Sequence, residues 1–150
     1  MTIAAEPRLE SLVSWQLAVA GRLIRSRADA HPAFQTAGAQ PTGVLIRLLE
    51  EDGLTQVALA RLQRIEAPTL CRMVDRLERE GLVERRAHPQ DRRAVRVHLT
   101  PAGRRAARRG RKGIPQVEEA VLRDLDEDEQ RRLGELLSRI LDALGSEAGA

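Results

Sequence analysis

Arginine side chains provide most of the chemistry available to this 150-residue chain. Residues 61–112 hold 16 Lys and Arg residues against 6 Asp and Glu residues, a net charge of +10, whereas the rest of the chain holds 9 against 16, a net charge of −7. Guanidinium groups bind phosphates and guanine edges through paired hydrogen bonds. A basic segment in an otherwise acidic chain therefore indicates a surface that faces nucleic acid, with a solvated charged face as the simpler alternative.

A helix-turn-helix is predicted where this segment begins. Residues 54–62 have a rough helical spacing of apolar side chains, and residues 63–66 have about the length of a helix-turn-helix corner. The second helix, about residues 67–80, begins near Pro68, which suits a first turn, and ends before Gly81, which suits a left-handed cap. Its apolar face repeats at i, i+3, i+4 and i+7 and consists of Leu70, Met73, Val74 and Leu77.

A two-stranded ribbon is predicted to follow, over about residues 82–99. Apolar and polar side chains alternate over residues 94–99, as in a strand with one buried face, and residues 89–91 form a turn cluster. Thr100 and Pro101 then supply an N-cap and a first-turn proline for a further helix. Helix, corner, helix and ribbon in this order predict a winged helix-turn-helix.

Longer helices flank this winged lobe, which is expected to span residues 41–113. Residues 8–40 contain a predicted helix over residues 9–30, and residues 114–145 contain a last helix that begins with a capping box at residues 126–129. Each has an apolar stripe that the lobe does not need for its own core, so we expect both regions to be buried together, within the chain and across a dimer. The expected fold class is mainly α with a small β-wing.

Two helix boundaries depend on glycine and proline. Pro41 opens a short helix that is expected to end at residues 50–53. The helix after the ribbon contains Gly110, Gly113 and Pro115, which weaken or bend helices. The pattern is compatible with one kinked helix or with two helices.

Composition limits the other functions. A single cysteine, Cys71, excludes an internal disulfide and fits a reducing compartment. No apolar run approaches the thickness of a bilayer and no signal-peptide pattern is present, so a soluble, cytoplasmic protein without a membrane partner is expected. His31, His88 and His98 are scattered, and we find no metal-ligand spacing, phosphate-cradling glycine loop or catalytic set, so we predict no metal, no cofactor and no enzyme.

In this order and at these spacings, the motifs resemble the MarR family of bacterial transcription regulators, over nearly the whole chain. The resemblance is carried by residues 54–56, 59–60, 68–69, 72–78, 81–85, 91–93 and 99–103. It implies a homodimer joined through its N- and C-terminal helices, with two recognition helices in successive major grooves of a pseudopalindromic operator and two wings in the flanking minor grooves. It also implies a repressor that a small phenolic or anionic effector releases from DNA. The ligand-binding residues of the family vary, so none is predicted here.

The resemblance assigns DNA contacts to the recognition helix. Pro68 and Thr69 lie in its first turn, and Arg72 or Arg76 would contact a guanine edge, worth roughly 1–3 kcal/mol of discrimination. The alternative is that both arginines only neutralise phosphates, or that a carboxylate of their own helix pairs with one of them.

The resemblance also assigns contacts to the wing. Arg93 would enter an A·T-rich minor groove, and Asp91 would shape the turn and orient that arginine, unless Asp91 is simply a turn residue. The residues expected to neutralise the DNA backbone are Arg86, His88, Arg92 and Arg96.

Two positions depart from the family pattern. Glu66 replaces the usual serine before the recognition helix, where glutamate caps less well and, as an anion, faces phosphate. Cys71 replaces a small polar residue, either as an inert thiol or as an oxidation-sensitive one. The rival functions are a winged-helix protein-interaction module or antirepressor, and non-specific DNA binding. The basic segment and the complete wing tip argue against the interaction module or antirepressor, and non-specific DNA binding stays a third alternative.

Overall fold

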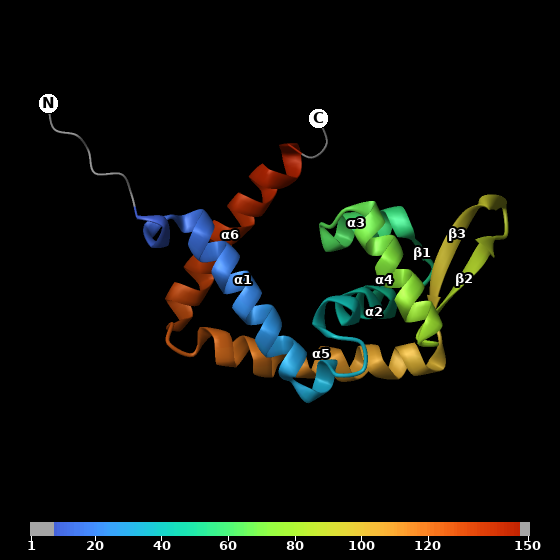
Figure 1. Cartoon of the computed structure of the whole chain (residues 1–150), viewed down its shortest axis with the longest axis horizontal. Helices are drawn as coiled ribbons and strands as arrows, with labels where there is room; N and C mark the ends of the chain where they lie inside the picture. The colour runs from blue at the N-terminus through green and yellow to red at the C-terminus, as the bar shows by residue number, and fades with distance from the viewer. Residues whose placement is uncertain (1–7, 148–150) are drawn as a thin grey trace, which may run out of the picture.

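The computed structural model describes residues 8–147, and of residues 92, 93, 146 and 147 only the backbone. The chain is mainly helical with one small antiparallel sheet, which confirms the predicted fold class (Figure 1). In chain order the elements are η1 (Leu9–Ser11), α1 (Val13–Ala30), η2 (Pro32–Phe34), α2 (Ala39–Glu50), β1 (Leu54–Thr55), α3 (Gln56–Gln63), α4 (Ala67–Arg79), β2 (Val83–His88), β3 (Asp91–Leu99), α5 (Pro101–Leu122) and α6 (Glu127–Glu147).

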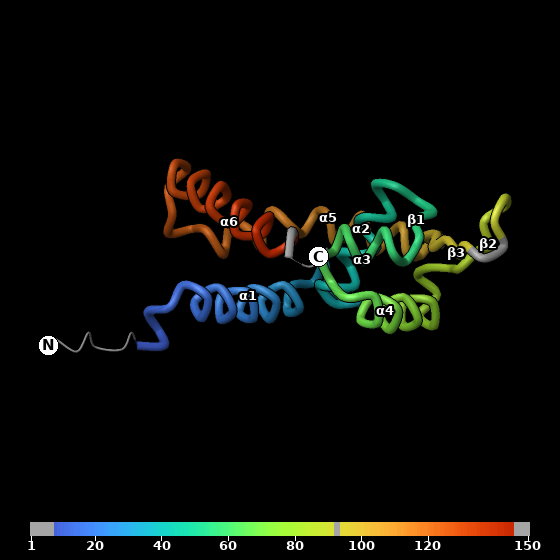
Figure 2. Tube along the Cα trace, turned by 90° about the horizontal axis from the view of Figure 1, so that it is seen from above, coloured from blue at the N-terminus to red at the C-terminus, as the bar shows by residue number. Residues whose placement is uncertain are grey.

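Helix α5 joins the two ends of the molecule. The elements α2, α3, α4 and the sheet gather around its first half, whereas α1 and α6 lie near its other end (Figure 1). Seen from above, α1 and α6 lie on opposite sides of that end (Figure 2). No helix in the described part of the chain has both the length and the apolar character needed to cross a membrane.

The core of the lobe is aliphatic, as expected in a chain whose only aromatic residues are Trp15 and Phe34. Helices α2, α3, α4 and α5 and the sheet all contribute buried side chains to one cluster. Its largest fully buried members are Leu45, Leu48, Leu59, Leu70 and Leu77. Burial of one leucine stabilises a fold by roughly 1.5–3 kcal/mol relative to an exposed position. The lobe can therefore form a core without the terminal helices.

The predicted two-stranded ribbon is confirmed as β2 and β3, and a third strand that was not predicted, β1, completes the sheet. The strand order is β1-β3-β2, and β1 pairs with β3 through Leu54–Val97 and Thr55–Arg96. Gly53, at φ 76°, turns the chain into β1, which explains why Leu54 lies in a strand instead of in the first helix of the corner. A strand of two residues carries no alternation, so its pairing could not be recognised locally.

Two helices begin at other residues than expected. Residues 9–11 form a 3₁₀ turn, Leu12 is extended and α1 starts only at Val13. Helix α2 starts at Ala39 instead of Pro41, because the Asp29 carboxylate accepts the Ala39 N–H at 2.7 Å and so replaces a local cap.

The other helix starts follow their capping signals. Thr100 Oγ1 accepts the Gly103 N–H at 3.1 Å, which confirms the predicted cap of α5. Asp126 and Glu129 exchange two hydrogen bonds of 2.9 Å, which confirms the capping box before α6.

Helix α5 is one continuous helix of 22 residues, and it crosses the expected domain boundary at residues 113–114 without a break. Its buried face consists of small residues, which include Gly103, Gly110 and Gly113. A methyl group on Gly110 would lie 2.2 Å from the Thr42 side chain. The glycines therefore allow α5 to pack closely against the lobe and against η2, and this packing offsets their weak helix propensity.

Asp52 connects the loop after α2 to both β3 and α5. Its Oδ1 accepts the Leu99 N–H at 2.9 Å, and its Oδ2 lies 3.1 Å from His98 Nδ1 and 3.7 Å from Arg104 Nη2. Partial burial raises the pKa of the Asp52 carboxyl, but the hydrogen bonds from Leu99 and His98 and the charges of His98 and Arg104 outweigh it. The pKa of Asp52 is therefore lower than its ordinary value of 3.8.

We expect the Asp52→Asn variant to lose about 1 kcal/mol of unfolding free energy near neutral pH, after solvent screening of this partly exposed group is taken into account. Because the pKa of Asp52 is lower in the folded than in the unfolded chain, its contribution is complete above the unfolded value of 3.8 and is lost as the pH falls through the folded value. Urea unfolding of both proteins from neutral pH to about pH 3 measures this difference. A difference that does not shrink at acid pH would contradict a role for the charge.

Candidate nucleic-acid interface

Helix α4 carries the predicted DNA-reading residues on its outer face. The direction of this face is fixed by three fully buried side chains on the other side, those of Leu70, Val74 and Leu77. Opposite them, Pro68, Arg72 and Arg76 are exposed and Thr69 is half-buried. The structure thus brings the four predicted helix residues together on one accessible surface.

The two candidate reading arginines have different partners. Arg72 Nη2 donates to Thr69 Oγ1 at 3.2 Å, a neutral acceptor one turn earlier. Arg76 Nε donates to Glu80 Oε1 at 2.8 Å and forms an ion pair with it. Arg76 must therefore leave a carboxylate to reach DNA, whereas Arg72 need only leave a hydroxyl. Arg72 is the better placed of the two to bind a base edge.

The first turn of α4 has no side-chain cap. Glu66 occupies the N-cap position, but its carboxylate accepts no hydrogen bond from the turn. The first N–H groups of an α-helix have no partner within the helix and readily bind phosphate. Glu66 thus leaves this end of α4 open, as its departure from the family pattern suggested.

Arg85 connects three elements of the lobe and was not predicted as a site residue. From β2, its Nη2 lies 2.5 Å from Asp75 Oδ1, and its Nη1 lies 2.5 Å from Glu78 Oε2, both on α4. Its Nη2 and Nε also donate to Gln56 Oε1, at the start of α3, at 2.8 Å and 3.2 Å. The Arg85 backbone N–H donates to Glu78 Oε1 at 3.1 Å. We call these four side chains the Arg85 clamp.

This arrangement stabilises the charged form of the Arg85 guanidinium. Partial burial lowers the pKa of its guanidinium, but the hydrogen bonds and charges of Asp75 and Glu78 outweigh burial and raise the pKa above its ordinary value. Arg85 therefore remains a cation whose charge two carboxylates compensate.

The predicted wing residues differ in the contacts that they make within the protein. Arg86 forms an ion pair with Glu84 on the same strand, and His88 Nδ1 accepts the Gln90 N–H at 3.2 Å across the turn. Asp91 is exposed and lies opposite His88 in the ladder, beside a register shift in β2. The side chains of the predicted contacts Arg92 and Arg93 lie outside the described residues, and their backbone belongs to β3.

Arg96 points into the lobe, although the sequence suggested a role at the DNA backbone. Its Nη1 donates to the Gly53 carbonyl at 3.0 Å, and its Nε is buried without a hydrogen-bond partner. The side chain thus supports the turn that leads into β1. Strand alternation could not have indicated this, because the position of Arg96 depends on its pairing with Thr55 of β1, which was not recognised in the sequence.

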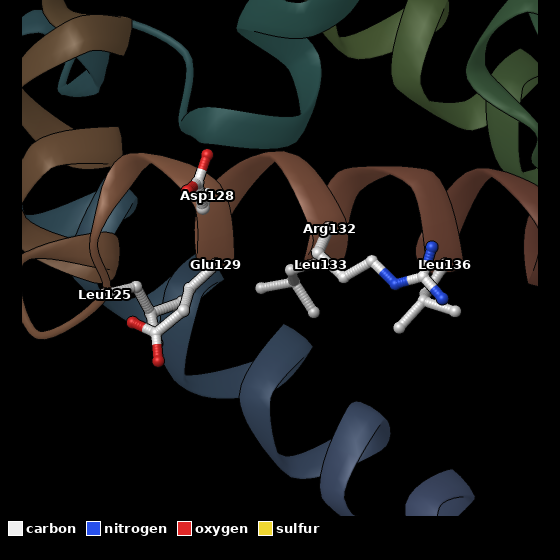
Figure 3. Close-up of a pocket in the computed structure, with 6 residues that line it drawn as sticks. All are labelled: Leu125, Asp128, Glu129, Arg132, Leu133 and Leu136. Atoms are coloured by element: carbon white, nitrogen blue, oxygen red, sulfur yellow. The ribbon is translucent and has the colours of Figure 1, made fainter.

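In the part of the chain that the structure describes, no group of three or more His, Cys, Asp and Glu residues is placed to hold a metal ion. One open hollow lies along the first turns of α6, where Leu133 and Leu136 of the helix and Leu125 just before it lie beside charged side chains (Figure 3). A second hollow on α5 is lined by Arg105, Arg108, Arg109 and Lys112.

Comparison with known sequences identifies relatives of this architecture. The sequence profile of the MarR family matches residues 42–95, which run from α2 into β3. A proposed transcriptional regulatory protein for the hcr operon of Thauera aromatica is 32% identical over 117 residues, which cover 77% of this chain and 66% of that protein. Both matches are to transcriptional regulators and not to enzymes.

Solved structures agree with this result. A probable transcriptional regulator from Pseudomonas aeruginosa is 31% identical, with a TM-score of 0.80 and coverage of 89% of this chain and 99% of that one. PcaV from Streptomyces coelicolor, in complex with its natural ligand, is 27% identical with a TM-score of 0.77, over 94% and 99% of the two chains. The MepR–DNA complex of S. aureus shares the fold, with a TM-score of 0.81. MepR is 23% identical, and the match covers 89% of this chain and 98% of that one.

Proposed function

The chain belongs to the MarR family of transcriptional regulators, and we propose on this basis that it is a cytoplasmic, sequence-specific DNA-binding repressor that acts as a homodimer on a pseudopalindromic operator. The observation that carries the proposal is the outer face of α4. There Thr69, Arg72 and Arg76 lie together on a helix whose other side is anchored in the core. A helix of this kind enters the major groove with its exposed face against the base edges.

Charge supports the same assignment. The face of α4 and the wing both belong to the segment of net charge +10, and phosphate neutralisation supplies most of the non-specific part of DNA affinity. Arg72 and Arg76 can add base-edge contacts on top of this background. The proposal therefore separates residues that position the protein from residues that select the sequence.

The homodimer is supported by apolar side chains that this single chain leaves uncovered. On α1, Leu23 is 62% exposed and Val13 is 62% exposed, and on α6, Leu136 is 40% and Leu144 is 61% exposed. No described side chain of α6 is buried. Two long helices with open apolar faces at one end of the molecule are the expected surface for a second copy of the chain.

A small phenolic or anionic effector is part of the proposal, because PcaV, a related protein, has been solved with its natural ligand. The effector would release the repressor from DNA by binding better to a conformation in which the two lobes no longer fit the operator. We assign no residues of this chain to that ligand.

The test is binding of the purified protein to the DNA upstream of its own coding sequence and to scrambled DNA of equal length, across a salt series. We expect tight, sequence-dependent binding by the wild type. We expect Arg72→Ala to reduce the preference for the operator by about tenfold, because a base-edge contact contributes roughly 1–3 kcal/mol. Arg93→Ala should weaken binding to operators with A·T-rich flanks.

Arg79→Ala is the matched control, since it removes the same charge from the last turn of α4, where Arg79 donates to the Asp75 carbonyl. It should leave the sequence preference nearly unchanged. Equal affinity of the wild type for both DNAs would favour non-specific binding, and no binding at low salt would favour a protein-interaction module or antirepressor.

A further inference from the structure

We propose that Arg85 is a positioning residue that sets the angle between the recognition helix and the wing, and thereby determines which sequences the protein accepts. The inference rests on the proposed function, because it concerns how the same DNA surface is assembled. Nothing in the sequence motifs assigns this role, and the residue itself need not touch DNA.

Arg85 lies where the wing, α4 and α3 meet. Its guanidinium bonds to α4 through Asp75 and Glu78 and to α3 through Gln56, while its backbone belongs to the first strand of the wing. Donation from the Arg85 backbone N–H to Glu78 ties the strand itself to the helix. A rotation of the wing relative to α4 would break several of these bonds together.

The electrostatics separate Arg85 from the arginines that face phosphate. Its side chain is only 23% exposed, and two carboxylates already compensate its charge. Arg86, the next residue, is 61% exposed on its side chain and pairs with the neighbouring Glu84 of its own strand. Arg85 therefore contributes little to phosphate neutralisation, and its main effect is on geometry.

The clamp explains why a strongly basic surface keeps two acidic residues on its recognition helix. Asp75 and Glu78 are exposed on α4, where they would repel DNA if nothing compensated them. Their presence on this surface is explained if they bind Arg85. Specificity requires the α4 contacts and the wing contacts to reach their grooves at the same time, and misplacement of either by about 1 Å loses a hydrogen bond.

Neutralisation of the two carboxylates distinguishes the clamp from simple charge effects. The Asp75→Asn/Glu78→Gln double variant keeps the shape of both side chains and raises the net charge by two. Attraction to phosphate alone predicts tighter binding and an unchanged preference for the operator. The clamp predicts that the ratio of operator affinity to scrambled-DNA affinity falls, by about tenfold or more.

The experiment measures this ratio, and the hydroxyl-radical footprint at saturating protein, for the full-length wild type, the double variant, Arg85→Ala and Arg85→Lys. We expect all three variants to lose protection at the operator flanks, where the wings bind, and to keep it at the two centres bound by α4. Lysine retains the charge but cannot bridge three acceptors in one plane, so it should not restore the ratio. Arg86→Ala is the charge-matched control and should weaken binding to both DNAs by a similar factor, with its flank protection retained.

The outcomes separate this inference from the proposed function. If the wild type shows no preference for the operator, the proposed function fails. If the wild type is selective but the double variant keeps both the ratio and the flank protection, the clamp is refuted. Should Arg85→Ala fail to fold in circular dichroism, the isosteric double variant still decides the question.

Discussion

Replacement of Gly103 by alanine is expected to destabilise the lobe by at least about 3 kcal/mol and to leave much of the protein unfolded near 37 °C. A methyl group on Gly103 would lie 1.8 Å from the Leu82 carbonyl oxygen and 2.8 Å from its carbonyl carbon. These are backbone atoms, and they cannot rotate away as the end of a side chain can. Leu82 is also fixed by hydrogen bonds of its N–H to the Leu77 carbonyl and of its carbonyl to the Thr100 N–H.

The relevant measurement is urea unfolding followed by circular dichroism, with Gly134→Ala as the control. Gly134 also lies inside a helix, but nothing is within 4 Å of the position of its missing methyl group. The control should be stabilised by about 0.5–1 kcal/mol, because alanine is the better helix former. Equal unfolding midpoints for the Gly103→Ala variant and the wild type would contradict the close approach of α5 to the start of the wing.

The second large effect concerns the proposed homodimer. The Leu23→Glu/Leu136→Glu variant should be a folded monomer, because both side chains are already exposed in a single chain and a partner would have to bury the new charges. Its affinity for the operator should fall by at least about 100-fold, since each lobe then binds one half-site without the effective concentration that the partner provides. Analytical ultracentrifugation gives the mass and a gel-shift titration gives the affinity.

A matched control places the same two charges outside the apolar stripes. Ser26 and Ser138 are exposed on α1 and α6, and the Ser26→Glu/Ser138→Glu variant should keep the mass and most of the affinity of the wild type. A dimeric mass for the leucine variant would mean that another surface joins the two copies. Monomers in both variants would point to non-specific electrostatic repulsion instead of a loss of the apolar interface.

Local signals explain why much of the fold could be predicted from the sequence. The recognition helix follows from an apolar repeat with spacing i, i+3, i+4 and i+7, and its observed bounds, Ala67–Arg79, agree with the expected 67–80. The caps at Thr100 and Asp126 depend only on residues three positions away. Such features need no information about the rest of the chain.

Non-local pairing explains what the sequence did not reveal. Strand β1 consists of two residues, and it exists only because β3, far along the chain, presents Arg96 and Val97 beside it. Likewise, the start of α2 depends on Asp29, which lies ten residues before the N–H that it caps. No spacing rule within a helix or a strand contains these contacts.

In the candidate site, too, local patterns could be predicted from the sequence and contacts between distant residues could not. The exposed face of α4 could be derived from the buried one, so Thr69, Arg72 and Arg76 are found together as expected. An ion pair between one of the two arginines and a carboxylate of the same helix was one of the expected alternatives. Which arginine forms it could not be predicted, because that depends on the rotamer that brings Glu80 to Arg76. Arg85 was missed because its partners lie 7, 10 and 29 residues away on two other elements.

Helix α5 can transmit a small rotation at one end of the molecule as a displacement at the other end. It is continuous from the base of the wing to the end where α1 and α6 lie, and its 22 residues span about 33 Å (Figure 1). If one end is held, a tilt of only about 6° moves the other end by about 3.4 Å, the spacing of one base-pair step along a DNA strand. A slight change in how two copies lean against each other would therefore shift the whole reading surface by one position on the operator.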